Sequence, residues 1–528
     1  MGSSIQPTPQ GMRPSSALFL PSIGNVIFVS TLAVLVFRIG NGLLFDGDTG
    51  YHIRVGQEIL KSWRVPVHDV FSFHSPPLKW TAHEWLSEVI LALLYDLWGL
   101  TGVVIFSALL LAATHWLLYS ILATYSTNTV GVMLVTVLAI ATSATHWLAR
   151  PHVFSLMLTT ICYHKLNQFQ YEGRATLRFL PWLMLFWVNL HGGYFLGLVL
   201  IGVYLGGNLL WSTFTLPQDS MRHKTKAKKL FVCLIVSVAT CGINPIGFEI
   251  LLFPLRLSSD PFIMESVLEF MSPNFHEASP FKYMLLAIVA AVAFSRHRCN
   301  PIEGGLLLLL IYMALYSARY VSLFAIILAP LLLKGTDCAL AVFPAPLQKF
   351  IRKRNENLTA VDRNVRGYFW PLVAMSLVIG FGVSGNLRFS FDEKRFPVAA
   401  VNFMLREPIS GKMFNHDEFG DYIIFAAWPR YRVFIDGRSD MYGPKWGGMY
   451  LQVTSLQPGW DALLAQNGIT WIIFDTDAPL SYALHGRSEW HAIYSDPVAT
   501  IFLKQTAEHA GLLRKYQSTA SPAIKSSH

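Results

Sequence analysis

Charged residues are scarce in this chain. Only 14% of its 528 residues are Asp, Glu, Lys or Arg, whereas 53% are hydrophobic. An ordinary soluble protein has about 25% charged residues. The apolar residues form many long runs separated by Gly, Pro and short polar breaks, which is typical of membrane helices and not of barrel strands. The composition therefore excludes a soluble enzyme and predicts a polytopic α-helical membrane protein.

Cysteine is scarce as well, and internal repetition is not visible. The five cysteines all lie in or beside apolar segments, none follows residue 338, and no C-x-x-C spacing occurs. These features exclude a disulfide framework and a thiolate metal site. Many transporters are built from two repeated halves. Because no such repeat is visible here, the sequence does not favour a transporter.

The net charge of +9 comes from basic residues concentrated in short stretches, such as "MRHKTKAKK" (221–229) and "KFIRKRNEN" (349–357). Clusters of this kind beside apolar runs mark cytoplasmic loops. The charge therefore does not indicate a nucleic-acid partner. Membrane lipids and lipid-linked phosphates are the partners that it favours.

About eleven spans are predicted when these basic stretches are placed in the cytoplasm. They cover approximately residues 22–44, 102–121, 128–147, 152–169, 178–191, 193–213, 229–246, 281–296, 303–317, 320–334 and 369–387. This topology gives a cytoplasmic N-terminal tail (1–21), a transmembrane domain (22–387) and an extracytoplasmic C-terminal domain (388–528). The first span lacks a cleavage pattern after it, so we expect it to remain as an anchor.

Residues 45–101 are expected to form one long external loop. Within it, "EWLSEVILALLYDLWG" (84–99) carries its apolar residues on one helical face, with three acids off that face. The segment is too short and too acidic for a span. We therefore expect a helix that lies in the membrane interface.

The C-terminal region changes character and predicts a small α/β domain. Pro397 opens a short helix, "FPVAAVNFMLRE". The runs "YRVFIDGR" (431–438), "TWIIFD" (470–475) and "ATIFLK" (499–504) are compact, rich in β-branched and aromatic residues, and predict strands.

Polar clusters interrupt the apolar runs at positions that this topology places outside. They are Asp46, Asp48, His52 and Arg54 after the first span, "ARPHVFS" (149–155), "WVNLHGG" (187–193), "GINPIG" (242–247), "ESVLEFMSPNFHE" (265–277) and "SARYVS" (317–322). Ionisable groups at membrane depth are costly, so six clusters on one side predict a cavity with a function.

The residue types suit transfer from a phosphate-linked donor. Arginine and histidine can bind phosphate oxygens, and carboxylates can act as a general base or hold a hard divalent cation. The candidate catalytic residues are Asp48, Glu269 and His52, and the candidate substrate-binding residues are Arg54, Arg150, His152, Asn189, His191 and Arg319. Plainer interpretations are a snorkelling anchor for Arg54, a packing role for His191, and neutralisation of carboxylates by Arg150 and Arg319.

A second polar group lies at the end of a predicted strand in the C-terminal region. Asp436, Gly437, Arg438 and Asp440 are typical of a turn held by salt bridges, which needs no ligand. Acceptor binding is the alternative for Asp436 and Arg438, and also for Asp421 and Tyr422.

Three stretches resemble the GT-C superfamily of membrane glycosyltransferases, which use polyprenyl-phosphate or pyrophosphate sugars, and especially its oligosaccharyltransferase catalytic subunits. "DGDTGYHIRVGQEIL" (46–60) is similar to their first-loop motif, and "SVLE" (266–269) is similar to the Ser/Thr-hydrophobic-x-Glu motif of a later loop. The stretch 401–438 resembles the start of their external domain, with "DEFGDY" (417–422) in place of the Trp-Trp motif. The resemblance implies a GT-C-like bundle in which Asp48 is the essential acid and Glu269 joins acceptor and metal.

The sequence also departs from that family. The second loop of the oligosaccharyltransferases carries an acidic pair, whereas the corresponding stretch of this sequence, "ARPHVFS", contains no acid. Either Asp48 and Glu269 hold Mg²⁺ or Mn²⁺, or the site is free of metal and Arg150 and His152 carry the phosphate charge. Without the Trp-Trp pair, the acceptor can be a glycan, a lipid or a protein.

The sequence thus predicts a membrane glycosyltransferase that acts on the extracytoplasmic face with a lipid-linked sugar donor. Because fold alone does not determine function, two alternatives remain. The first is a non-catalytic scaffold of the same fold, favoured by the missing second-loop acids. The second is a transporter or flippase of a lipid-linked glycan.

Overall fold

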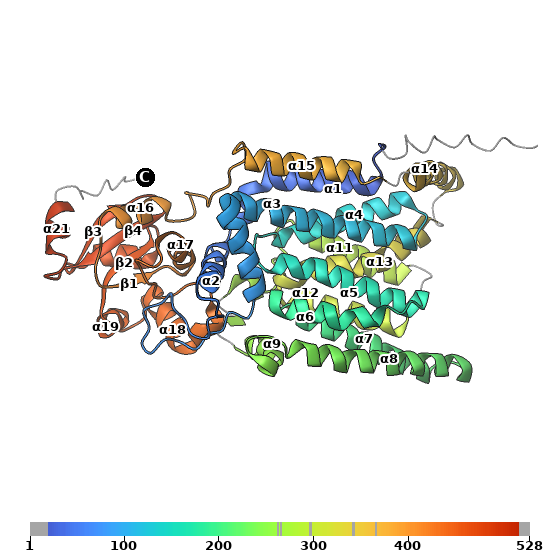
Figure 1. The fold of residues 1–528 in the computed structure, drawn as a ribbon, viewed down its shortest axis with the longest axis horizontal. Coiled ribbons are helices and arrows are strands. Elements are labelled where there is room, and N and C mark those ends of the chain that lie inside the picture. Colours follow the sequence, from blue (N-terminus) through green and yellow to red (C-terminus); the bar gives the residue numbers. More distant parts are fainter. Residues whose placement is uncertain are drawn as a thin grey trace, which may run out of the picture.

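The computed structural model describes residues 19–516, except 261–262, 265–266, 295–297, 341–343 and 365–366. Most of the predicted N-terminal tail (1–21) and Ser266 of the "SVLE" stretch lie outside the described residues. A long bundle of helices meets a smaller α/β domain at one end, as Figure 1 shows. This junction is where the site residues gather.

The bundle consists of helices that run along the long axis of the molecule (Figure 1). They are α1 (Ile23–Ala33), α3 (Trp85–Tyr125), α4 (Thr129–Ser143), α5 (His152–Glu172), α6 (Leu180–Leu190), α7 (Tyr194–Thr213), α8 (Pro217–Cys241), α11 (Pro280–Phe294), α12 (Pro301–Tyr316), α13 (Val321–Leu340) and α15 (Phe369–Val383). The shorter α9 (Phe253–Ser258) and the peripheral α14 (Ala345–Asn364) accompany them. Each of the eleven predicted spans falls on one of the bundle helices.

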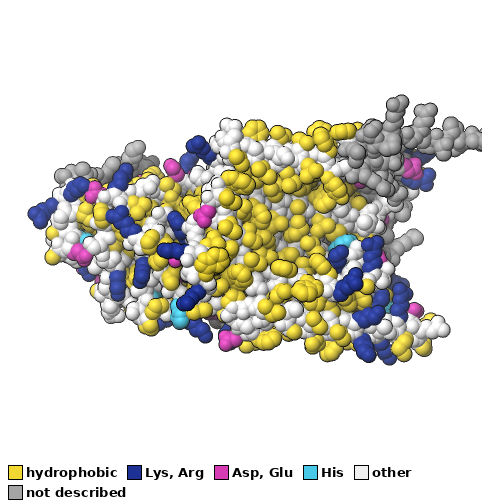
Figure 2. Space-filling view, in the orientation of Figure 1, with side chains coloured by type: hydrophobic (Ala, Val, Ile, Leu, Met, Phe, Trp, Pro, Cys, Tyr) yellow, Lys and Arg dark blue, Asp and Glu magenta, His cyan; other side chains and the backbone are white. Residues whose placement is uncertain are grey.

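By length and hydropathy, five described helical segments qualify as membrane spans, and four more apolar helices are shorter. The five are Ile23–Leu44, Trp85–Tyr125, Thr129–His146, Tyr194–Thr213 and Ala318–Asp337. Hydrophobic side chains cover the middle of the bundle surface, and Lys and Arg gather at the end away from the α/β domain (Figure 2). The protein is therefore an integral, multi-pass membrane protein, and the number of eleven spans stays a prediction.

Both basic stretches that were predicted as loops are helical. Residues 221–229 belong to α8, which Pro217 opens, and residues 349–357 belong to α14. Lys and Arg have high helix propensity, and Pro is favoured in the first turn. Charge therefore located these segments at one end of the bundle without indicating their secondary structure.

The predicted interfacial segment 84–99 forms the first part of α3. The helix is interrupted at Trp98 and Gly99, where the backbone leaves helical geometry and Gly99 has φ +63°. A positive φ is costly for residues with a Cβ, so Gly99 allows the chain to change direction. The first part of α3 can thus pack on α2 (Asp48–Ser62) before the chain enters the bundle.

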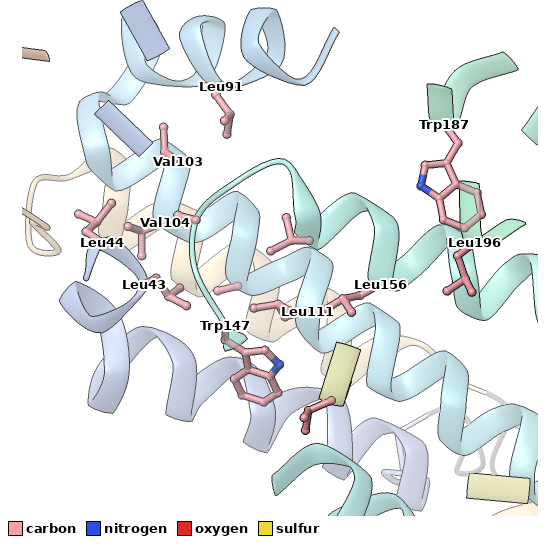
Figure 3. Packing of buried hydrophobic residues seen from close by; sticks show 14 of the residues in the cluster. Leu43, Leu44, Leu91, Val103, Val104, Leu111, Trp147, Leu156, Trp187 and Leu196 are labelled. Carbon is pink, nitrogen blue, oxygen red and sulfur yellow. The ribbon is translucent and has the colours of Figure 1, made fainter. Parts of the chain in front are cut away.

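One apolar core connects the end of the first span to the bundle. Leu43 and Leu44, close to Val104 in Figure 3, are completely buried, and they belong to the same cluster as Leu111 and Trp187. The backbone carbonyl of Leu43 accepts a hydrogen bond of 2.7 Å from the N–H of Ala149. This contact aligns the first external loop with the segment between α4 and α5.

The α/β domain contains a four-stranded sheet of order β1-β2-β4-β3. Its strands are β1 (Lys412–Asn415), β2 (Ile469–Asp475), β3 (Trp490–Ser495) and β4 (Ala499–Lys504); β1 and β2 are parallel, and the other pairs are antiparallel. The helices are α16 (Val398–Arg406), α17 (Asp417–Ala427), α18 (Ser439–Thr454), α19 (Trp460–Gln466), α20 (Pro479–His485) and α21 (Ala510–Tyr516). The predicted helix after Pro397 and the strands at 470–475 and 499–504 are present.

The third predicted strand, 431–438, was wrong, because this segment is not part of the sheet. It forms an isolated bridge with the first external loop, in which Val433 N–H donates to Phe71 O (3.0 Å) and Phe73 N–H donates to Val433 O (3.2 Å). The side chain of Asn415 bonds the backbone of Phe434 and Ile435. The β-forming residues of 431–438 therefore connect the α/β domain to the first external loop.

Candidate functional site

Asp48 is the first residue of α2 and follows the first span directly. The N–H of Asp48 donates to Asp46 Oδ1 (2.9 Å), which holds the Asp46 side chain beside the start of the helix. One residue on, the Thr49 hydroxyl donates to the carbonyl of Ala149 (3.1 Å). These bonds bring Asp46 and Asp48 beside Arg150.

Glycines allow α2 to pack very closely against its neighbours. A Cβ on Gly50 would lie 2.7 Å from Phe425 Cβ of α17, and a Cβ on Gly56 would lie 2.0 Å from Glu88 O of α3. A Cβ on Gly47 would lie 2.9 Å from the Cβ of Asp421. Since such distances leave no room for a side chain, α2 is held between the external domain and the bundle.

The guanidinium of Arg150 lies between three carboxylates from two different loops. Its Nη1 is 2.5 Å from Asp46 Oδ2 and 2.5 Å from Glu269 Oε1, and its Nη2 is 2.5 Å from Asp48 Oδ2. We call these four residues the Arg150 cluster. Its acids come from the first loop and the loop before α11, so residues far apart in sequence meet at one point.

Arg319 extends this cluster. Its Nε is 3.8 Å from Glu269 Oε2, and its guanidinium carbon is 5.0 Å from the centre of the Phe270 ring. The Ser317 hydroxyl donates to the backbone carbonyl of Glu269 (2.8 Å), which ties the two loops together. The side chain of Arg319 is 26% exposed, so part of this arginine remains accessible to a ligand.

The two acids that the sequence singled out differ in their electrostatics. Burial raises the pKa of Asp48 well above its ordinary value; Arg150 opposes this shift, and the Asp46 and Glu269 carboxylates add to it. Burial also acts to raise the pKa of Glu269, but Arg150 and Arg319 outweigh it and hold the pKa below its usual range. Glu269 is therefore ionised, whereas the carboxyl of Asp48 holds a proton more strongly than an ordinary aspartate does.

A second polar cluster, which the sequence analysis missed, is centred on Glu84. The Glu84 carboxylate lies 3.9 Å from His52 Nε2, 3.7 Å from His83 Nε2 and 3.6 Å from His191 Nε2, and it accepts from the N–H of Gly192 (3.2 Å). Glu84 was read only as a polar residue of an interfacial helix. Its place at the start of α3, preceded by His83, was the available signal.

Two of the histidines beside the Glu84 carboxylate, His52 and His191, are buried and have low pKa values. Burial lowers the pKa of His52 to about 3 and that of His191 to about 4. Burial acts to raise the pKa of Glu84, but His191, His83 and His52 hold it at about 2. Because His52 Nδ1 also lies 3.2 Å from Glu88 Oε1, this residue is held in place by acids on two sides.

Several candidate substrate-binding residues have protein partners. The guanidinium of Arg54 donates to the carbonyl of Phe425, with Nε at 2.7 Å. His152 Nε2 lies 3.0 Å from His146 O, and His191 Nδ1 lies 2.7 Å from Ser155 Oγ. Asn189 accepts from the Trp85 indole (2.7 Å) and donates to Ile243 O (2.9 Å). These contacts order the loops around the Arg150 cluster.

Among the C-terminal candidates, Asp421 reaches the Arg150 cluster. Its Oδ1 accepts from the N–H of Gly437 (2.9 Å), and a Cβ on Gly437 would lie 2.1 Å from Asp48 Oδ1 and 3.0 Å from Asp421 Oδ2. The carboxyls of Asp48 and Asp421 thus lie against the same glycine. Tyr422, the next residue, is buried and packs on Phe391.

Asp436 and Arg438 form a buried ion-pair network with the first loop. Arg438 Nη2 is 2.6 Å from Asp436 Oδ2, and its Nη1 is 2.8 Å from Asp69 Oδ1. The Tyr442 hydroxyl donates to Asp436 (2.6 Å), and the Trp80 ring covers the guanidinium at 4.7 Å. This network joins the external domain to the loop that carries Asp48.

The arrangement does not fit a divalent cation at Asp48 and Glu269. Both carboxylates contact Arg150, whose guanidinium lies between them. Within the described part of the chain, no group of three or more His, Cys, Asp or Glu residues is arranged to hold a metal ion. The residues present are therefore arranged around an organic cation.

Comparison with solved structures shows the fold. The crystal structure of the Archaeoglobus fulgidus oligosaccharyltransferase in the apo form aligns with a TM-score of 0.53 and 11% identity, over 94% of this chain and 75% of that chain. The chain therefore has a fold similar to that of this oligosaccharyltransferase. ArnT from Cupriavidus metallidurans bound to undecaprenyl phosphate has a TM-score of 0.39 and 13% identity, over 91% of this chain and 96% of that chain, which is too low a score to support an argument.

Comparisons of sequence add nothing to this similarity. No family model matches the chain, and no curated protein matches it. The predicted GT-C resemblance is thus confirmed at the level of the fold. The roles of individual residues depend on the geometry described above.

Proposed function

We propose that this protein is a membrane glycosyltransferase that transfers a sugar from a polyprenyl-phosphate or pyrophosphate donor to an acceptor. The observation that carries the proposal is the convergence of Asp48, Arg150, Glu269 and Arg319 at the junction of bundle and external domain. A basic carboxyl beside accessible arginines matches what transfer from a phosphate-linked donor requires.

The proposed chemistry is an inverting displacement. The acceptor atom forms a bond to the anomeric carbon of the sugar while the bond from that carbon to the phosphate oxygen breaks. Asp48 takes the proton of the acceptor, and the departing phosphate keeps the electron pair. Arg319, which is partly exposed, is placed to bind this phosphate, and Glu269 holds both arginines in position.

The proposed orientation places the site on the extracytoplasmic face. In Figure 2, basic residues gather at the opposite end of the bundle and others are spread over the α/β domain; beside membrane helices such residues favour the cytoplasm. The N-terminus would then lie inside and the α/β domain outside. A polyprenyl chain could reach the site laterally from the bilayer, and the acceptor could approach from the aqueous side.

One observation favours a non-catalytic scaffold as a second candidate. The Arg150 cluster is satisfied by protein groups alone, as ion pairs with a structural role are. In that case the external domain would bind a partner, and Asp48 would matter for stability only.

The test is transfer of radiolabelled sugar by purified protein from a panel of polyprenyl-phosphate and pyrophosphate donors to a mixed panel of glycan, lipid and peptide acceptors. Asp48→Asn preserves size and should lower the rate by about 100-fold or more, because a general base contributes 10²–10⁴. Asp461→Asn, in an exposed ion pair with Arg487, is the matched control and should retain full activity. Full activity of Asp48→Asn would contradict the proposal, and folded wild-type protein without any transfer would favour the scaffold.

A further inference from the structure

The Arg150 cluster has the composition of a cation site, with an arginine where the cation would be. Three carboxylate oxygens, from Asp46, Asp48 and Glu269, converge at 2.5 Å on the terminal nitrogens of one guanidinium. Carboxylates are the usual ligands of a hard divalent cation, but here they are arranged around the two terminal nitrogens of a guanidinium. Three acids around one arginine also exceed what a single ion pair needs.

We propose that the guanidinium of Arg150 is a built-in replacement for a divalent cation, so that the protein works without a metal. The proposal rests on the glycosyltransferase function proposed above. Arg150 orients the three carboxylates, and Arg319 presents its charge to the phosphate of the donor.

The backbone around Arg150 supports a fixed position for its guanidinium. The N–H of Ala149 donates a hydrogen bond to Leu43 O (2.7 Å), and the carbonyl of Ala149 accepts one from the Thr49 hydroxyl (3.1 Å). On the other side, Pro151 leads directly into α5. The arginine is thus anchored to the loop that supplies Asp46 and Asp48, and its charge does not depend on pH.

The chemistry of the guanidinium fits the geometry. A guanidinium has five N–H donors in one plane and can bind several carboxylates at once, whereas a lysine offers a compact charge. Nη1 contacts Asp46 and Glu269, and Nη2 contacts Asp48. The positive charges of the guanidinium groups are therefore in place before a substrate binds. Metal ions from the solvent do not need to supply them.

The experiment measures Mn²⁺ binding to the purified full-length protein by electron paramagnetic resonance, which does not depend on knowing donor or acceptor. Wild type should show no saturable binding. Arg150→Asp removes the cation and adds a fourth acid, and it should gain the saturable Mn²⁺ binding that wild type lacks. Arg150→Gln, which is neutral and close in size, should also gain binding if the aspartate variant does not fold.

Saturable Mn²⁺ binding by wild type that is lost in Glu269→Gln would overturn the proposal. So would folded Arg150→Asp and Arg150→Gln proteins that gain no binding, since the carboxylates would then not form a cation site. With a working donor, wild-type transfer should be unchanged by EDTA, and a loss with EDTA would also overturn it. Failure to find any donor would count against the glycosyltransferase and leave the Mn²⁺ result standing.

Discussion

Arg150 and Arg438, both in the described part of the chain, each contact more than one carboxylate, and they differ in access to solvent. The side chain of Arg438 is 1% exposed and that of its partner Asp69 is also 1% exposed. The side chain of Arg150 is 12% exposed, and its partners Asp46 and Glu269 are 27% and 22% exposed. The chemistry of the pairs is the same, so accessibility separates a structural arginine from one that can serve a ligand.

The surroundings of the two arginines explain this difference. Phe71 and Trp80 of the first loop cover Arg438 at 5.1 and 4.7 Å, which seals the network. The Arg150 cluster lies at the end of the bundle, where Arg319 is partly exposed. Substitutions that separate stability from transfer can therefore test the comparison.

The largest effect is expected for Arg438→Met. Without the guanidinium, Asp69 and Asp436 remain buried without a cation, which costs about 3–5 kcal/mol. We expect a large drop in the thermal unfolding temperature in detergent, or failure to recover folded protein. Arg487→Met, in an exposed pair, is the control and should change stability by less than about 1 kcal/mol. Equal stability of the two variants would remove the structural role of Arg438.

The next effect is expected for Arg319→Ala, and it should appear in the rate. Losing one charge that stabilises the departing phosphate should lower transfer by roughly 100-fold. Stability should change by less than about 1 kcal/mol, because the side chain is partly exposed and its pair with Glu269 is long. Arg256→Ala, in an exposed pair with Glu249, is the control for both measurements. A parallel fall in stability and rate would make Arg319 structural.

A smaller effect that depends on pH is expected for Asp421→Asn. Burial, together with the Asp48 and Asp436 carboxyls, raises the pKa of Asp421, and none of the described Lys or Arg side chains forms an ion pair with it. Such a carboxyl stabilises the fold below its unfolded pKa, and the contribution is lost as the pH rises through the folded pKa. Asparagine should therefore be more stable than wild type at pH 8, by about 1 kcal/mol, and equal to it near pH 4.

The measurement is thermal unfolding of both proteins across this pH range. Asp436→Asn is the contrasting variant, because it weakens the pair with Arg438 and should destabilise at pH 8. A stability difference for Asp421→Asn that does not change with pH would show that this carboxyl has the same protonation state in folded and unfolded protein.

The smallest effect is expected for Arg54→Gln. Arg54 donates to the backbone of Phe425 in α17, and a hydrogen bond from a charged donor contributes about 1.5–3 kcal/mol, part of which glutamine can retain. We expect a loss of stability of about 1 kcal/mol and little change in transfer. A fall in transfer without a fall in stability would instead assign Arg54 to the substrate.

Much of the bundle was predictable, because the length of an apolar run indicates whether it can form a membrane helix. Every predicted span falls on a helix, and the predicted helix at 84–99 forms the first part of α3, whereas its place in the membrane interface stays a prediction. The basic stretches were predicted as loops and are helical, because charge does not distinguish a loop from a helix. The segment 431–438 was read as a strand, because its β-forming residues do not reveal that their partner is the first loop.

The site was also predictable in part, from the contrast between ionisable residues and the apolar runs around them. Acids and arginines near apolar runs are conspicuous, so Asp48, Glu269, Arg150 and Arg319 were named and do meet in space. Glu84 was missed, because its role depends on His52 and His191 approaching from other segments. Sequence spacing cannot express a contact among three elements that only tertiary packing brings together.

The glycine contacts of α2 determine how the protein can be divided. Gly47 and Gly50 bring α2, the helix that bears Asp48, directly against α17 of the external domain. The same helix also packs against α3 of the bundle. A cut near residue 388, where hydropathy marks the boundary, would separate Asp48 from Gly437 and Asp421. Neither fragment would then contain all the residues that meet at this junction, and exchanging the external domain for that of a distant relative would exchange part of the cluster with it.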